Sequence, residues 1–215
     1  MRFRLAIFDW NGTLLNDLPA AYGAVVHIFQ TVSPNLEPPT LEEYCNEITS
    51  KFMDFYYAHG IPTSVSGDDL NNIRKPYYEE HSRTAKLNDG AREFLARCQE
   101  LGLKNAMVSA SPEDVEKTLA EFGVANLFDK IRLKAWPKDA ALRETVEYFG
   151  IRPEEAFYVD DTFDGITSAK NLGLWTIGFT GGYNTRERIL AARPNYAVDS
   201  LRHAIAILNS WEVKP

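Results

Sequence analysis

After residue 90 the chain alternates between short apolar runs and stretches of helical period, and this alternation limits the fold more than any other feature. Within the helical stretches, apolar residues recur three or four positions apart over about 10–12 residues, as on the buried face of a helix. The runs, with an earlier one near the amino end, read as strands at residues 4–8, 105–108, 130–135, 156–159, 175–178 and 196–198. Strands that alternate with helices form right-handed βαβ units. The pattern therefore predicts a doubly wound α/β fold, with a parallel sheet and helices on both faces.

Polar residues mark where some of the helices begin. Ser111 followed by Pro112, with Asp114 three residues on, has the pattern of a helix start. Lys138 opens the helix that precedes the strand at 156–159, and Asp199 or Ser200 is expected to cap the final helix.

The segment from about residue 16 to residue 86 interrupts the alternation. It has helical periods rich in aromatic and polar residues, with breaks at Pro34, at Pro38-Pro39, at residues 60–62 and at Ser66-Gly67. No run within it reads as a buried strand, and we interpret it as an inserted unit of about four helices. The expected organisation is an α/β core domain formed by residues 1–15 and 87–215, with an α-helical cap domain at 16–86.

Charge and cysteine content narrow the classes of partner. With 30 acidic and 23 basic side chains, the 215-residue chain has a formal net charge of −7. This balance disfavours nucleic-acid binding, which needs a basic surface. The two cysteines, Cys45 and Cys98, are far apart and fit no disulfide framework, as expected in a reducing cytoplasm. No apolar window is long enough to span a membrane and no export signal is evident, so we expect a cytoplasmic protein, monomeric or homodimeric.

Polar side chains follow several of the expected strands. Because ligands of open parallel sheets bind beyond the carboxyl ends of the strands, we expect these side chains to lie near one another. They are Asp9, Asn11, Ser109, Lys138, Asp160, Asp161 and Asp164. Taken alone, an aspartate before Asn-Gly is an ordinary turn former. Several carboxylates that converge on one edge repel one another, however, and a divalent cation with oxygen ligands would relieve that repulsion.

In this order, these segments resemble the four signatures of the haloacid dehalogenase superfamily of hydrolases. Residues 8–14, Phe-Asp-Trp-Asn-Gly-Thr-Leu, resemble the first signature, DxDGTL, and residues 107–109 resemble the second, an apolar strand that ends in Ser or Thr. Lys138 fits the lysine of the third signature, and residues 159–166 with 169–173 fit the fourth. The resemblance covers nearly the whole chain and is greatest to phosphoglycolate-phosphatase-like members. It implies a Rossmann-like core whose helical cap selects the substrate.

The resemblance implies a Mg²⁺-dependent hydrolase of a small phosphorylated metabolite, working through an aspartyl-phosphate on Asp9. Under it, the catalytic residues are Asp9, Asn11, Ser109 and Lys138. The phosphate-binding residues are Asp9, Asn11, Gly12, Ser109, Ala110 and Lys138. The Mg²⁺ ligands are Asp9, the backbone carbonyl of Asn11, and Asp161, with Asp160 and Asp164 as alternates.

Asn11 departs from the family pattern. The family's phosphatases have an aspartate at this position that protonates the leaving group, and an amide cannot exchange a proton in that way. Loss of such a group typically lowers the rate by about 10²–10⁴-fold. Two alternatives follow: an impaired pseudoenzyme that binds Mg²⁺ and phosphate, or a hydrolase of C–P bonds similar to phosphonoacetaldehyde hydrolases, with Lys51 forming a Schiff base. The fourth signature also departs from the family pattern, since Gly165 stands where a second acid is usual.

Overall fold

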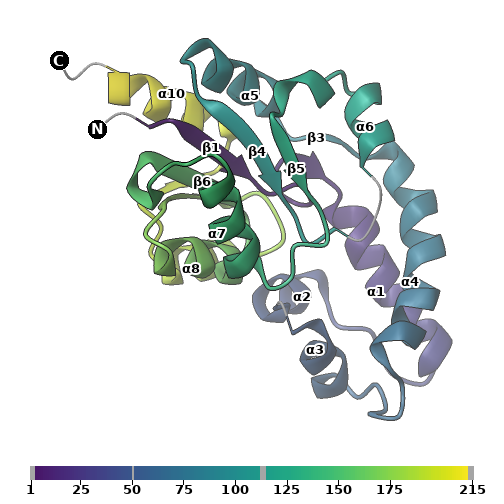
Figure 1. Ribbon diagram of the computed structural model, residues 1–215. Helices are drawn as coiled ribbons and strands as arrows, with labels where there is room; N and C mark the ends of the chain where they lie inside the picture. Colours follow the sequence, from purple (N-terminus) through teal and green to yellow (C-terminus); the bar gives the residue numbers. More distant parts are fainter. Residues whose placement is uncertain (1–2, 50, 112–114, 213–215) are drawn as a thin grey trace.

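A six-stranded parallel sheet forms the centre of the protein. The computed structural model describes residues 3–49, 51–111 and 115–212. The strand order is β5-β4-β1-β6-β7-β8 (Figure 1). The strands are β1 Leu5–Phe8, β4 Lys104–Val108, β5 Lys130–Arg132, β6 Ala156–Asp160, β7 Trp175–Phe179 and β8 Tyr196–Val198. Every neighbouring pair in the sheet is parallel, which confirms the doubly wound α/β fold.

Helices cover both faces of this sheet, and the alternation of side chains along β1 explains how. Ala6 and Phe8 face one apolar cluster, which includes residues of α5 and α10, whereas Leu5 and Ile7 face a second cluster with residues of α7 and α8. The core helices are α5 Ala91–Glu100, α6 Glu116–Glu121, α7 Lys138–Tyr148, α8 Phe163–Asn171, α9 Arg186–Ala191 and α10 Leu201–Glu212. Short 3-10 helices occur at η1 Ser82–Thr84, η2 Ala125–Leu127 and η3 Pro153–Glu155.

The prediction of a strand at 130–135 is wrong in its second half. β5 ends at Arg132, and Lys134 has φ 52°, a left-handed conformation that a strand does not accommodate. The N–H groups of Lys134 and Ala135 instead donate to the carbonyls of Ser111 and Ser109. The chain therefore turns back toward the end of β4 before it enters α7.

The structure shows two of the three expected helix starts. α7 begins at Lys138, and the Ser200 hydroxyl accepts a hydrogen bond from the N–H of Arg202 at the start of α10. α6 begins at Glu116, while residues 112–114, on which the expected start after Ser111 depends, lie outside the described residues.

Residues 16–86, which we call the cap, contain four α-helices and η1 in their described part and join the core through a small second sheet. In that sheet β2 Leu15–Asn16 pairs antiparallel with β3 Lys86–Leu87. The helices are α1 Leu18–Val32, α2 Leu41–Glu47, α3 Phe52–Ala58 and α4 Gly67–His81. They enclose an apolar cluster of their own, and in Figure 1 the arrowheads of β1, β4 and β5 point toward them. No helix in the described part of the chain is long and apolar enough to cross a membrane.

Candidate active site

Asp9 lies directly after the central strand, at the start of a tight turn. Its N–H donates to the Val159 carbonyl of β6, and the N–H groups of Leu14 and Leu15 both donate to the carbonyl of Trp10. Gly12 has φ 74°, and a Cβ atom at this position would lie 2.1 Å from an oxygen of Asp161. The turn therefore requires glycine, both for its conformation and for close approach of the chain to the carboxylate.

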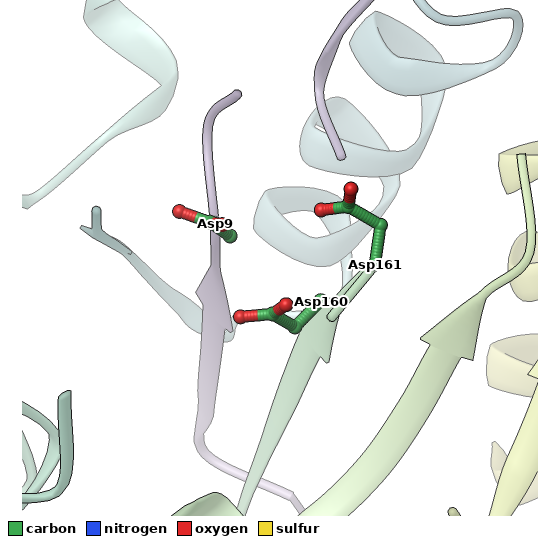
Figure 2. A group of neighbouring side chains, drawn as sticks. All are labelled: Asp9, Asp160 and Asp161. Atoms are coloured by element: carbon green, nitrogen blue, oxygen red, sulfur yellow. The ribbon is translucent and has the colours of Figure 1, made fainter. Parts of the chain in front are cut away.

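Three carboxylates meet at the ends of two neighbouring strands. Figure 2 shows Asp9 just beyond β1, Asp160 at the end of β6 and Asp161 next to it. One oxygen from each of the three carboxylates can be chosen so that all lie within 4.8 Å of one another. Because β1 and β6 are adjacent parallel strands, their carboxyl ends bring together residues about 150 positions apart in the sequence.

Lys138 neutralises part of this negative charge. Its Nζ lies 2.8 Å from an oxygen of Asp9 and 2.5 Å from an oxygen of Asp160, and the side chain is buried. Asp160 also accepts from the Tyr158 hydroxyl at 2.5 Å, and from the N–H and the hydroxyl of Thr162 at 2.7 and 2.6 Å. Both oxygens of Asp160 thus accept two hydrogen bonds each, which uses the acceptor capacity of a carboxylate.

Unlike Asp160, Asp161 and Asp9 have carboxylate oxygens that accept fewer hydrogen bonds than they can. Asp161 accepts one hydrogen bond at each oxygen, from the Thr13 hydroxyl at 2.5 Å and from the Tyr183 N–H at 2.6 Å. Oδ1 of Asp9 is buried and has no hydrogen-bond partner among the described residues. A Mg²⁺ ion takes hard oxygen ligands of this kind. The residues fit that cation, with Asp9 and Asp161 better suited than Asp160 to coordinate it. Asp164 lies in the first turn of α8, outside the group of three.

Burial disfavours the ionised forms of these carboxylates when no cation is bound. It raises the pKa of Asp9 to about 6, an effect that Lys138 opposes and Asp160 reinforces. Burial also raises the pKa of Asp161 well above its ordinary value, with Asp160 and Asp9 adding to the rise. Burial alone would lower the pKa of Lys138, but Asp160 and Asp9 outweigh it and hold that pKa above its usual range. A bound divalent ion would relieve the repulsion that remains.

Sequence reasoning missed Asp17, which is central to the site. It is 1% exposed and accepts four hydrogen bonds, from Asn11 Nδ2 at 2.7 Å, the Gly12 N–H at 2.8 Å, the Tyr78 hydroxyl at 2.6 Å and the Tyr183 hydroxyl at 2.8 Å. Asp17 immediately precedes α1, where an aspartate normally caps the helix, but its side chain makes no cap hydrogen bond. The carboxylate instead ties the turn after Asp9 to α4 and to the loop after β7.

Asp17→Ala is expected to lower the free energy of unfolding by about 2–3 kcal/mol, because it leaves buried donors without their charged acceptor. Urea denaturation measures this change. Glu80→Ala, which removes an exposed carboxylate, is the matched control and should change the free energy by less than about 0.5 kcal/mol. A loss for Asp17→Ala no larger than that of the control would contradict the role assigned to Asp17.

A cavity of about 870 Å³ lies between the cap and the core. Six of the site residues expected from the sequence line it: Asp9, Asn11, Ser109, Ala110, Lys138 and Asp164. The other three, Gly12, Asp160 and Asp161, are buried and are not among the lining residues. The N–H of Gly12 donates to Asp17 and to the Leu15 carbonyl, so in this structure it is engaged within the turn.

Lys51 is not brought to this site. Its side chain is exposed, its backbone N–H donates to the Thr49 hydroxyl, and it is not among the described residues that line the cavity. The geometry thus offers no support for a Schiff base at Lys51.

Comparison with known families agrees with this geometry. A family model described as haloacid dehalogenase-like hydrolase matches residues 6–179. The chain is 26% identical over 221 residues to a phosphoglycolate phosphatase of Vibrio parahaemolyticus, covering 95% of this chain and 96% of that protein. It is 25% identical to a phosphoglycolate phosphatase of Pseudomonas putida, covering 93% of this chain and 77% of that protein.

Solved structures share the fold. A crystal structure described as a predicted phosphoglycolate phosphatase from Haemophilus somnus superimposes with a TM-score of 0.77 at 20% identity, covering 97% of this chain and 99% of that one. A β-phosphoglucomutase from Clostridium difficile has a TM-score of 0.73 at 16% identity, with 99% and 100% covered. At these identities the likeness concerns the fold.

Proposed function

The chain belongs to the haloacid dehalogenase-like hydrolases, and from that premise we propose that it is a Mg²⁺-dependent phosphatase of a small phosphate monoester. The observation that carries the proposal is Oδ1 of Asp9, an oxygen with no hydrogen-bond partner among the described residues, in a side chain that lines the cavity. Lys138 holds the other oxygen at 2.8 Å and so orients the carboxylate. The names of the two relatives above agree with this activity.

In the proposed reaction, a carboxylate oxygen of Asp9 attacks phosphorus, the P–O bond to the leaving group breaks, and an aspartyl-phosphate forms. Water then attacks the same phosphorus, which releases inorganic phosphate and restores the carboxylate. Lys138 offsets charge on Asp9 and on the transferred group, and Ser109 supplies a hydroxyl at the end of β4. Mg²⁺, held by Asp9, the Asn11 carbonyl and Asp161, would neutralise charge on the phosphoryl oxygens.

Mg²⁺ is expected to stabilise the folded protein, since only the folded chain brings Asp9 and Asp161 together. At about 100 times its Kd the stabilisation would be about 2.7 kcal/mol, measured as a rise in Tm without any substrate. Asp161→Asn should abolish the rise, whereas Asp164→Asn should retain it. The opposite outcome would assign the ligand role to Asp164 in place of Asp161.

Steady-state assays with 4-nitrophenyl phosphate, acetyl phosphate and 2-phosphoglycolate, with and without Mg²⁺, test the activity. Mg²⁺-dependent release of phosphate from at least one of them is the expected result. Asn11 favours a second candidate, a protein that binds Mg²⁺ and phosphate without turnover. An absence of turnover across a broad panel of phosphate esters, with the Tm rise intact, would support that candidate and contradict the phosphatase.

A further inference from the structure

The carboxylate that contacts Asn11 is not placed to replace the missing acid. The nearest carboxylate is that of Asp17, 2.7 Å from Asn11 Nδ2. It already accepts four hydrogen bonds, it is 1% exposed, and it is not among the described residues that line the cavity above Asp9. Because a carboxylate only accepts, the NH₂ group of Asn11 must face it. Asp17 is thus committed to the turn and is not aimed at a bound ester.

Two tyrosine hydroxyls and the ammonium group of Lys138, all in side chains that line the cavity, donate to carboxylates as well. Tyr78 and Tyr183 line the cavity, but both hydroxyls donate to Asp17, at 2.6 and 2.8 Å. Lys138 donates to Asp9 and to Asp160. To protonate a leaving group, each of these donors would have to break its hydrogen bond to a buried carboxylate. That carboxylate would then lack a hydrogen-bond partner.

Apolar and aromatic side chains line much of the cavity, alongside the polar side chains Asp68, Asn71 and Arg74 of α4. The large apolar and aromatic ones come from all four cap helices and, in one case, from the core: Val25, Ile28, Tyr44, Phe52, Tyr56, Leu70 and Trp136. At about 870 Å³, the cavity is far larger than a two-carbon leaving group such as glycolate requires. Cavities lined in this way bind apolar rings and position them through a few polar groups.

These two observations point to one class of substrate. A phenol has a pKa of about 10, like the tyrosine side chain, whereas the pKa of an alkyl alcohol is far higher, near that of water. A phenolate can therefore leave without a proton from the protein, and its ring matches the apolar and aromatic side chains of the cavity. Building on the phosphatase proposed above, we infer that the substrates are aryl phosphate monoesters. Asp9 oxygen bonds to phosphorus, the aryl C–O⁻ departs with the electron pair of the broken P–O bond, and the solvent protonates it according to its pKa.

A series of leaving groups, assayed with the Mg²⁺-loaded protein, tests whether the reaction depends on the acidity of the leaving group. The probes are 4-nitrophenyl phosphate, phenyl phosphate and 2-phosphoglycolate. We expect kcat/KM to fall steeply with rising leaving-group pKa, with 2-phosphoglycolate at least about 10²-fold below phenyl phosphate. Equal values for the last two esters would overturn the inference but leave the phosphatase intact, whereas no turnover of any ester would contradict the phosphatase itself.

The double variant Asn11→Asp/Asp17→Asn gives a matched comparison. It exchanges an amide and a carboxylate that lie 2.7 Å apart, so one N–H···O hydrogen bond can still join them, while an acid now stands at position 11. Asn11→Asp alone would set two carboxylates against each other. We expect the exchange to narrow the gap between phenyl phosphate and 2-phosphoglycolate by about tenfold or more. An unchanged gap in a folded double variant would overturn the inference, and if the variant does not fold, the series on the unaltered protein decides.

A comparison of two ring sizes tests whether the cavity binds the aromatic ring of the substrate. 2-Naphthyl phosphate and phenyl phosphate have leaving groups of similar acidity and differ by one fused ring. Burial of that ring against the apolar and aromatic side chains of the cavity should lower KM by about tenfold. A KM for the naphthyl ester equal to or above that of the phenyl ester would overturn the assignment of an aryl substrate.

Discussion

Asp9→Asn will lower kcat by at least about 10⁴-fold, a loss typical of removing a covalent nucleophile. The amide oxygen that replaces the carboxylate carries no charge and does not attack phosphorus, while the shape of the side chain is nearly unchanged. Lys138 can still donate to this oxygen, so the geometry around the turn should survive. Phosphate release from 4-nitrophenyl phosphate measures the loss, and retention of even one hundredth of the activity would contradict Asp9 as the nucleophile.

The same variant should make the metal-free protein more stable at neutral pH. Burial raises the pKa of Asp9 from 3.8 to about 6. The folded state therefore holds the proton more tightly than the unfolded state, and this contribution to stability is lost as pH rises from about 4 to about 6. At about 1.4 kcal/mol per pKa unit, the ionised side chain costs about 3 kcal/mol above pH 6.

Urea denaturation in EDTA between pH 4 and pH 7.5 measures this effect. The free energy of unfolding of Asp9→Asn should exceed that of the unaltered protein by about 2–3 kcal/mol at pH 7 and by little at pH 4. Glu80→Gln, which neutralises an exposed carboxylate, should show no such pH-dependent gain. Together the two readouts would show that an essential side chain is held at a cost in stability, and equal stabilities at pH 7 would contradict that cost.

Lys138→Met will destabilise the fold by about 3–5 kcal/mol at pH 7.5, because it leaves Asp9 and Asp160 buried without their cation. Methionine keeps an unbranched apolar chain, so the change isolates the ammonium group. The loss should shrink at pH 5, where a carboxylate with a raised pKa takes up a proton more readily. We also expect kcat to fall by about 10²–10³-fold, as when one electrostatic donor to a transition state is removed.

A control and a second substitution separate the charge of Lys138 from its packing. Lys117→Met removes an 88% exposed lysine and should cost less than about 1 kcal/mol. Adding Asp9→Asn to Lys138→Met should recover part of the lost stability, since one of the two uncompensated charges is then gone. A loss for Lys138→Met as small as that for Lys117→Met, or no recovery in the double variant, would contradict the role of Lys138 as the buried counter-ion.

Local patterns were sufficient for the fold class and for most of the candidate site. Alternating strands and helices implied a parallel sheet, and in such a sheet the residues that follow each strand share one edge. The order of these elements along the chain is therefore enough to place Asp9, Asp160 and Lys138 together. The two-residue strands β2 and β3 were too short to show a period, and the left-handed Lys134, which ends β5 early, has no signature in its own residue type.

The role of Asp17 and the contacts that distinguish Asp160 from Asp161 became evident only once the chain was folded. Asp17 is bound by Tyr78 and Tyr183, which lie 61 and 166 positions away in the sequence, and no local pattern reports contacts at such separations. Asp160 and Asp161 are adjacent residues of the same type. Successive side chains at the end of a strand point in different directions, so one meets Lys138 and the other Thr13, and the packing of the neighbouring elements sets which carboxylate keeps capacity for a cation.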